Sequence, residues 1–149
     1  MKRLLLLVLI VSSTAFSQGI EFRKERYAEV LKMAKEQNKL VFIDIYTSWC
    51  GPCKHMADNI FPLPKVGEYY NTYFLNLQLD AEKSEDGKMV AKSFGVSAYP
   101  TFLFVNGDGE LVYRFLGGKS EDMFIKEGEK AEQEKVIAAF IARLNVLYE

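Results

Sequence analysis

Apolar and polar positions along the chain predict several short strands. The apolar run from Leu40 to Tyr46 is rich in β-branched and aromatic residues, which favours a buried strand. Alternation from Tyr73 to Leu79 predicts a second strand. The segments 101–105 and 110–116 flank Asn106-Gly107-Asp108-Gly109, and such a turn between two apolar runs is a strong hairpin signal. The last two strands are therefore expected to be antiparallel.

In the segments before, between and after these strands, apolar residues recur at helical spacing, which predicts helices. We expect helices over residues 21–37, 50–59, 85–94 and 132–147, with a short helical turn near 65–71. Pro62 and Pro64 are expected to end the second helix. The third helix is expected to turn Met89, Val90 and Phe94 inward. The last helix carries one apolar stripe, made of Val136, Ile137, Phe140, Ile141 and Leu144.

The order of these elements, α-β-α-β-α-β-β-α, predicts a single α/β domain. We expect a mixed central sheet with helices on both faces, a three-layer arrangement. The chain has 19 basic and 20 acidic residues among 149, with no repeat and no low-complexity tract. So mild a net charge does not indicate nucleic acid or an anionic membrane as partner.

The first residues have the pattern of an export signal. A short basic start precedes an unbroken apolar run over 4–11, and small residues then suit cleavage after Ser17. The run is shorter than the roughly 20 apolar residues that span a bilayer, so we expect no stable membrane insertion. A retained N-terminal anchor is the alternative. We therefore predict a signal peptide over 1–17 and one mature domain over 18–149, in the periplasm or another extracytoplasmic compartment.

The two cysteines of the chain lie in the run Trp49-Cys50-Gly51-Pro52-Cys53-Lys54. A cross-link between them would close too short a loop to stabilise the fold much, which favours reactivity as their role. A helix that begins at Cys50 would place its sulfur beside unpaired N–H groups, and in such motifs the cysteine pKa falls from about 8.5 to about 3.5–7.5. Cys53 lies nearly one turn further on. The spacing predicts a nucleophile at Cys50 and a resolving thiol at Cys53.

The residues between and around the cysteines fit this chemistry. Gly51 would let a substrate backbone approach, and Pro52 is tolerated in a first helical turn. A zinc site would need about four ligands, whereas the chain offers two cysteines and His55. A c-type haem site would need histidine where Lys54 stands. A strained copper site on both cysteines and His55, or a purely structural disulfide, stays open as an alternative.

Two further residues are candidates for the site. Asp44 interrupts the first strand on the same face as Phe42 and Tyr46, where burial would raise its pKa toward neutrality. It could lie beneath the cysteines and exchange the Cys53 proton through a water, or it could cap a loop at the strand edge. Pro100 directly precedes a strand, and from the residues alone we expect an ordinary trans proline there.

These motifs together resemble the thioredoxin superfamily over residues 39–118. The match rests on the run from Asp44 to Lys54, on Tyr99-Pro100-Thr101 and on the hairpin that leads to Gly117. The resemblance implies a thioredoxin-like three-layer fold with a redox-active disulfide. It also implies roles for single residues: Cys50 as nucleophile, Cys53 as resolving cysteine, Asp44 as buried acid/base, Pro100 as a cis-proline that faces the disulfide, and Trp49, Gly51, Pro52 and Tyr99 as substrate-binding residues. One departure is Asn76, which stands where thioredoxins usually carry a lysine near the buried aspartate.

The segment 43–50 also looks like the thioredoxin-like domains of membrane thiol–disulfide interchange proteins. We therefore expect an exported thiol–disulfide oxidoreductase that reduces protein disulfides without a bound cofactor or metal. We expect it to act as a monomer that is recharged by a membrane-embedded thiol–disulfide interchange donor. The alternatives are an oxidase or isomerase with the same chemistry, and a thiol-based metallochaperone or docking module.

Overall fold

The structure, a computed structural model, describes residues 19–147, so the predicted signal peptide over 1–17 lies outside the described part. The elements follow in this order: α1 (Tyr27–Gln37), β1 (Leu40–Tyr46), α2 (Gly51–Asn59), α3 (Pro64–Tyr73), β2 (Phe74–Asp80), α4 (Glu85–Ser93), β3 (Thr101–Val105), β4 (Leu111–Leu116) and α5 (Glu121–Leu147). None of these helices is long and apolar enough to cross a membrane.

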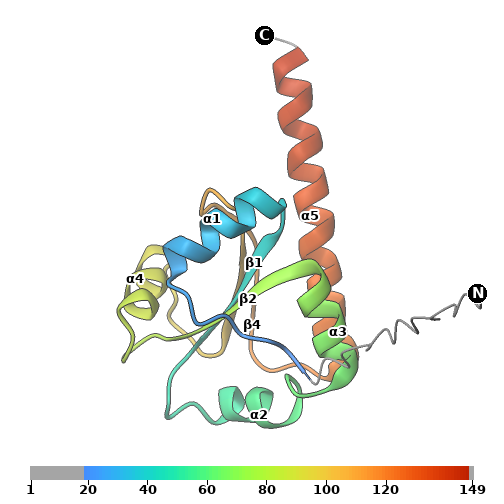
Figure 1. Ribbon diagram of the computed structural model, residues 1–149. Helices are drawn as coiled ribbons and strands as arrows, with labels where there is room; N and C mark the ends of the chain where they lie inside the picture. The colour runs from blue at the N-terminus through green and yellow to red at the C-terminus, as the bar shows by residue number, and fades with distance from the viewer. Residues whose placement is uncertain (1–18, 148–149) are drawn as a thin grey trace, which may run out of the picture.

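A mixed four-stranded sheet forms the centre of the molecule, in the order β2-β1-β3-β4. β1 runs parallel to β2 and antiparallel to β3, and β3 pairs with β4 as the predicted hairpin. Helices α1 and α4 cover one face of the sheet, and α2, α3 and α5 cover the other (Figure 1). The predicted α/β fold with three layers is confirmed.

The two faces of the sheet bury different kinds of side chain. In β1, Val41, Ile43 and Ile45 point to the side of α1 and α4, where nearly all buried residues are aliphatic. Leu40 and Phe42 point to the other side, where phenylalanine and tyrosine rings from the sheet, α3 and α5 pack together. The period-2 alternation of a strand produces this division. The aromatic half of the core is also the half that supports α2.

Three predictions about helix boundaries and faces within residues 21–94 were wrong. Residues 21–26 precede α1 and are not helical, and Phe22 forms a bridge with Asn76 of β2. Pro64 begins a full helix, α3, where only a short helical turn was expected. Proline has no N–H, and it therefore fits the first turn of a helix. Met89 is exposed, because α4 turns Val90 and Ala91 to the core.

The last helix departs most from its prediction, because it begins at Glu121 instead of residue 132. Its first half packs on the aromatic core through Phe124, Gly128 and Ala131. A Cβ atom at Gly128 would lie 2.7 Å from the Tyr69 ring, so only glycine allows this close approach. The predicted apolar stripe lies beyond this packed half, and four of its five residues are exposed.

Candidate active site

The two cysteines lie at the junction between β1 and α2. After β1 ends at Tyr46, a tight turn closes with a hydrogen bond from the Cys50 N–H to the Thr47 carbonyl oxygen. Cys50 has extended backbone and occupies the N-cap position of α2, and its Sγ accepts a hydrogen bond of 3.1 Å from the Cys53 N–H. The sulfur of Cys50 therefore lies against the positive end of the helix, as predicted.

Cys50 and Cys53 are joined in a disulfide, with their Cα atoms 5.3 Å apart. Both residues are nearly buried, whereas Gly51 and Pro52 between them are exposed. Apart from its chain neighbours and the backbone of its own helix, no atom of the described residues lies within 4 Å of where a Gly51 side chain would begin, so the space in front of the motif is open. A partner chain can approach the disulfide from this side.

Asp44 lies on the face of β1 that α2 covers, and only 1% of its surface is exposed. Burial raises the pKa of Asp44 to about 7, because a charged carboxylate loses its hydration there. Its Oδ2 accepts a hydrogen bond of 3.0 Å from the Gln78 side chain, which lowers the pKa in part. Its Oδ1 is buried without a hydrogen-bond partner in the described part of the chain. The carboxyl is thus poised to hold or release a proton near neutral pH.

Gln78 is the neighbour of Asp44 on β2, and the sequence analysis did not identify it. Asn76, which stands at the position of the family's lysine, is instead paired with Phe42. The Asn76 amide donates to Asn71 Oδ1 at 2.9 Å and to the Glu21 carbonyl. The parallel register of β1 and β2 sets Asp44 opposite Gln78, and that register is the signal from which this contact could have been predicted.

A hollow of about 240 Å³ lies beside the disulfide. Its walls come from the end of β1, the following turn, the first turns of α2 and β2: Tyr46, Thr47, Ser48, Cys50, Cys53, Lys54, Ala57 and Gln78. The hollow therefore touches both cysteines and the residue that donates to Asp44. A space of this size with polar groups in its wall can hold water.

The rim of the site contains the remaining predicted residues. The Tyr99–Pro100 bond is cis, as the resemblance implied and the residues alone did not. The Tyr99 ring packs edge-on against the Trp49 ring, with centroids 5.8 Å apart, so the turn before β3 lies beside the cysteine motif. Trp49 is 67% exposed, and its indole N–H donates to the Glu82 carboxylate at 3.0 and 3.1 Å. Glu82 is a second rim residue that the sequence analysis missed.

The geometry around His55 does not build a metal site. His55 is exposed on α2, where it contacts the Asn59 side chain. Among residues 19–147, no three or more histidine, cysteine, aspartate or glutamate side chains gather closely enough to hold a metal ion. The chemistry that the described residues support is thiol–disulfide exchange.

Comparisons with known proteins agree with this geometry. Residues 27–132 match the family of the thioredoxin-like domain. Thioredoxin H4 of Arabidopsis thaliana is 40% identical over 96 residues, which are 64% of this chain and 75% of that protein.

Two solved structures are similar over most of their length. One is the solution structure of a protein from Bacteroides thetaiotaomicron proposed to be a disulphide-isomerase: it is 42% identical, with a TM-score of 0.67, over 77% of this chain and 94% of that one. The other is the oxidised C-terminal domain of DsbD from Neisseria meningitidis, 25% identical with a TM-score of 0.60, over 69% and 90%.

Proposed function

This chain belongs to the thioredoxin-like family and is a thiol–disulfide oxidoreductase, and from that premise we propose that it reduces the disulfides of exported proteins. The observation that carries the proposal is the Cys50–Cys53 pair at the N-terminus of α2, on the side of the sheet where Asp44 is buried. The Gly51-Pro52 dipeptide between the cysteines resembles that of reducing members of the family.

In the proposed reaction the reduced enzyme gives two electrons to a substrate disulfide. The Cys50 thiolate attacks one substrate sulfur, a mixed disulfide forms, and the other substrate sulfur leaves as a thiolate. The Cys53 thiol then loses its proton to Asp44 through an intervening water and attacks Cys50 Sγ. The second substrate sulfur leaves as a thiolate, the two released thiolates take up protons, and the Cys50–Cys53 disulfide remains.

The rim residues are proposed to bind the substrate. Trp49 and Tyr99 form an aromatic edge beside the cysteines, and the exposed Gly51-Pro52 segment leaves room for an extended chain. The backbone of Tyr99, next to the cis Pro100, is proposed to pair with that chain. Main-chain pairing of this kind gives affinity without demanding one substrate sequence, which suits an enzyme with many protein substrates.

The oxidised enzyme must be reduced again, and we propose a membrane-embedded thiol–disulfide interchange protein as the electron donor. The likeness of segment 43–50 to the thioredoxin-like domains of such proteins supports this partner, as does the structural similarity to the DsbD C-terminal domain. No step of the proposed reaction uses a bound cofactor. The partner would dock on the same rim as the substrate, since both exchange disulfides with Cys50.

A second candidate function is disulfide oxidation or isomerisation. The similarity to the Bacteroides thetaiotaomicron protein proposed to be a disulphide-isomerase favours this candidate. The chemistry at Cys50 and Cys53 would be the same, and only the direction of electron flow would differ. The reduction potential of the cysteine pair therefore decides between the two.

We expect a reduction potential below about −230 mV for residues 18–149, as befits a reductant. Trp49 is the single tryptophan of the chain and directly precedes Cys50, so its fluorescence can report the redox state across thiol–disulfide buffers. A potential above about −180 mV would favour the oxidase or isomerase. If no reversible two-electron transition occurred, a metallochaperone or docking module would replace the enzyme.

The export part of the proposal rests on the sequence of residues 1–17 and has its own test. When the full chain is produced in a bacterium, we expect it in the extracytoplasmic fraction with a mass that begins at Gln18. A bulky charge at the cleavage site, in Ala15→Arg, is expected to block processing. Recovery of the intact chain from the cytoplasm would contradict export.

A further inference from the structure

Helix α5 has two halves with different surroundings. The first half is fixed to the domain: the Tyr70 hydroxyl donates to the Phe124 carbonyl, and Glu127 accepts from the Tyr113 hydroxyl and from Lys130. Beyond Ala131 no residue of the helix is fully buried, up to its end at Leu147. Figure 1 shows these last turns extending beyond the rest of the molecule.

The projecting half carries the apolar stripe, which we define as Val136, Ile137, Phe140, Ile141 and Leu144. Four of these side chains are between 50% and 66% exposed, and Val146 and Leu147 at the tip are 76% and 78% exposed. Arg143 is the one charged residue between 136 and 147. An apolar surface of this extent is rarely left in water and marks an interaction site.

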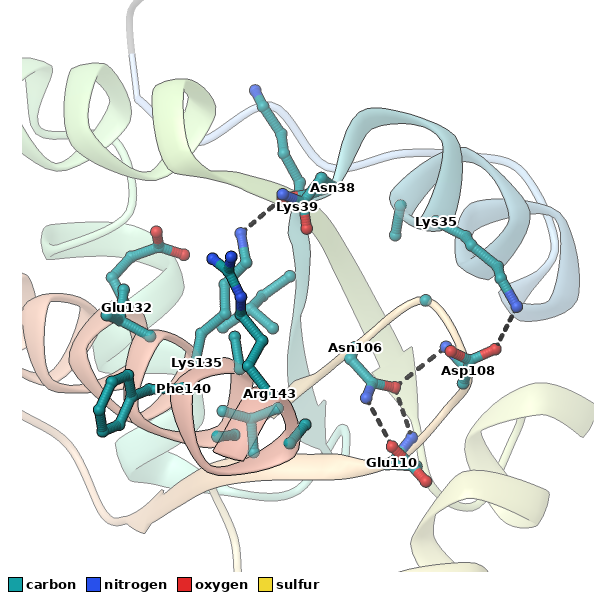
Figure 2. Close-up of a pocket in the computed structure, with 18 residues that line it drawn as sticks. Lys35, Asn38, Lys39, Asn106, Asp108, Glu110, Glu132, Lys135, Phe140 and Arg143 are labelled. Atoms are coloured by element: carbon teal, nitrogen blue, oxygen red, sulfur yellow. Dashed lines mark hydrogen bonds and ion pairs between the residues drawn. The ribbon is translucent and has the colours of Figure 1, made fainter. Parts of the chain in front are cut away.

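The flank of α5 that faces the domain carries the polar side chains of Lys135 and Arg143, and Val136 and Phe140 of the stripe lie at its edge. Lys135 donates from Nζ to the Asn38 carbonyl oxygen, and Arg143 lines the same groove of about 720 Å³. Figure 2 shows both side chains pointing toward the loop at Asn38 and Lys39, away from Phe140. The side chains of Val136, Ile137, Phe140 and Ile141 stay at least half exposed, so the domain covers the stripe only along the edge where Val136 and Phe140 meet this groove.

We propose that the stripe is the interface of a homodimer, in which a second copy of this chain packs its α5 antiparallel against the first. Five exposed side chains on the stripe side of the helix, Val136, Ile137, Phe140, Ile141 and Leu147, each offer on the order of 100 Å² of apolar surface. Buried on both copies, these side chains together cover about 1,000 Å², which is the least that a specific interface is expected to bury. A two-fold dimer uses the same patch on both copies, and a stripe without charges meets itself without repulsion.

A two-fold axis that crosses the stripe sets the two helices antiparallel. A shallow, mostly apolar hollow, lined by Glu132, Gln133, Val136 and Ile137, lies at the base of the stripe. When two stripes overlap fully in opposite directions, the tip of one helix reaches the base of the other. Leu147 of the second copy then meets Ile137 and this hollow, and Leu144 of the second copy meets Phe140.

A lipid surface is the competing occupant, and the charges disfavour it. Helices that lie in a membrane interface carry several Lys or Arg on the polar face. Here residues 132–147 contain two basic residues, Lys135 and Arg143, and two acidic ones, Glu132 and Glu134. A segment with no net charge gains little from anionic headgroups, whereas pairing with its own copy needs no charge.

The test is the mass of residues 18–149 in solution, measured by sedimentation equilibrium at micromolar concentrations in both redox states. We expect twice the monomer mass. The double variant Ile137→Glu/Leu144→Glu places charges in the seam, and we expect its dimer dissociation constant to rise on the order of 100-fold or more. Ala142→Glu is the matched control, since residue 142 is exposed on the polar flank, and it should stay dimeric.

Every outcome decides the proposal. A wild-type monomer at all concentrations would overturn it, in agreement with the sequence expectation of a monomer. A double variant that still dimerises would place the interface elsewhere. Wild-type protein that sediments with anionic vesicles and stays monomeric would assign the stripe to lipid.

Disulfide reduction is expected to be unchanged in the double variant, because α2 lies at the opposite end of the molecule from the tip of α5 (Figure 1). Failure here is thus distinct from failure of the enzymatic proposal.

Discussion

Disulfide reduction is expected to fall to the uncatalysed background when Cys50 is replaced by serine. A hydroxyl at this N-cap cannot act as the thiolate does, because serine stays protonated near neutral pH and forms no mixed disulfide. The rate of insulin disulfide reduction, with a chemical thiol as electron donor, measures the loss. Partner binding by a non-catalytic docking module would survive the same substitution, so this variant also separates the two classes of function.

Cys53→Ser is the complementary variant, with a different expected result. The Cys50 sulfur keeps its hydrogen bond from the backbone N–H of residue 53, so its attack on the substrate disulfide proceeds. No thiol is then present to resolve the mixed disulfide. Substrate proteins should then accumulate as mixed disulfides that appear on non-reducing gels and vanish with reductant. His55→Ala, an exposed change on the same helix, is the control that should keep wild-type activity. Mixed disulfides that accumulate with Cys50→Ser and not with Cys53→Ser would mean that Cys53 is the nucleophile.

The free energy of unfolding is expected to depend on pH through Asp44. The folded-state pKa is raised to about 7, whereas the unfolded chain titrates near 4. Between these values the unfolded state has lost a proton that the folded state keeps, so stability falls as the pH rises. This difference in pKa between the folded and unfolded states corresponds to about 4 kcal/mol of stability, which is lost progressively as the pH rises from about 4 through about 7.

Asp44→Asn removes this titration and is expected to flatten the pH dependence between about pH 4 and pH 7. The variant should therefore be more stable than the wild type above pH 7. Urea unfolding of the oxidised protein measures the effect without interference from thiol ionisation. Wild-type pH dependence in Asp44→Asn would show that another group titrates.

The same variant is expected to slow turnover, because Cys53 loses the group that takes its proton. The expected loss is on the order of 100-fold, typical of general acid–base groups. Gln78→Leu is the matched companion: it keeps the carboxyl but removes the hydrogen bond to Oδ2 that lowers the pKa. In that variant the pH midpoint of the stability change should move upward.

Local patterns predicted the parts of the fold that local physics decides. The strand β1, the start of α2 at the cysteine pair and the β3–β4 hairpin each follow from a short run of residues. The length of α5 could not be predicted in this way. Its first half contains Glu127 and Lys130 among few apolar residues, and it is held by Tyr70 and Tyr113, which come from distant segments.

The site was predicted where the motif is contiguous and missed where it depends on strand register. Cys50 and Cys53 lie in one run with Trp49, whereas Gln78 and Glu82 reach the site from a different part of the chain. The sequence pointed to Asn76 as the neighbour of Asp44 because it matches the family position of a lysine. In the structure a shift of two residues along β2 brings Gln78 there instead.

The two halves of the core can be observed separately by spectroscopy, because one is mainly aromatic and the other mainly aliphatic. Rings are concentrated under α2, α3 and α5, so near-ultraviolet dichroism and ring-current shifts report mainly on that half. Methyl signals of Val30, Ile43, Ile45 and Val90 report on the half under α1 and α4. The loosening of the layer that carries the disulfide can thus be observed separately from that of the opposite layer, in one sample and without added labels.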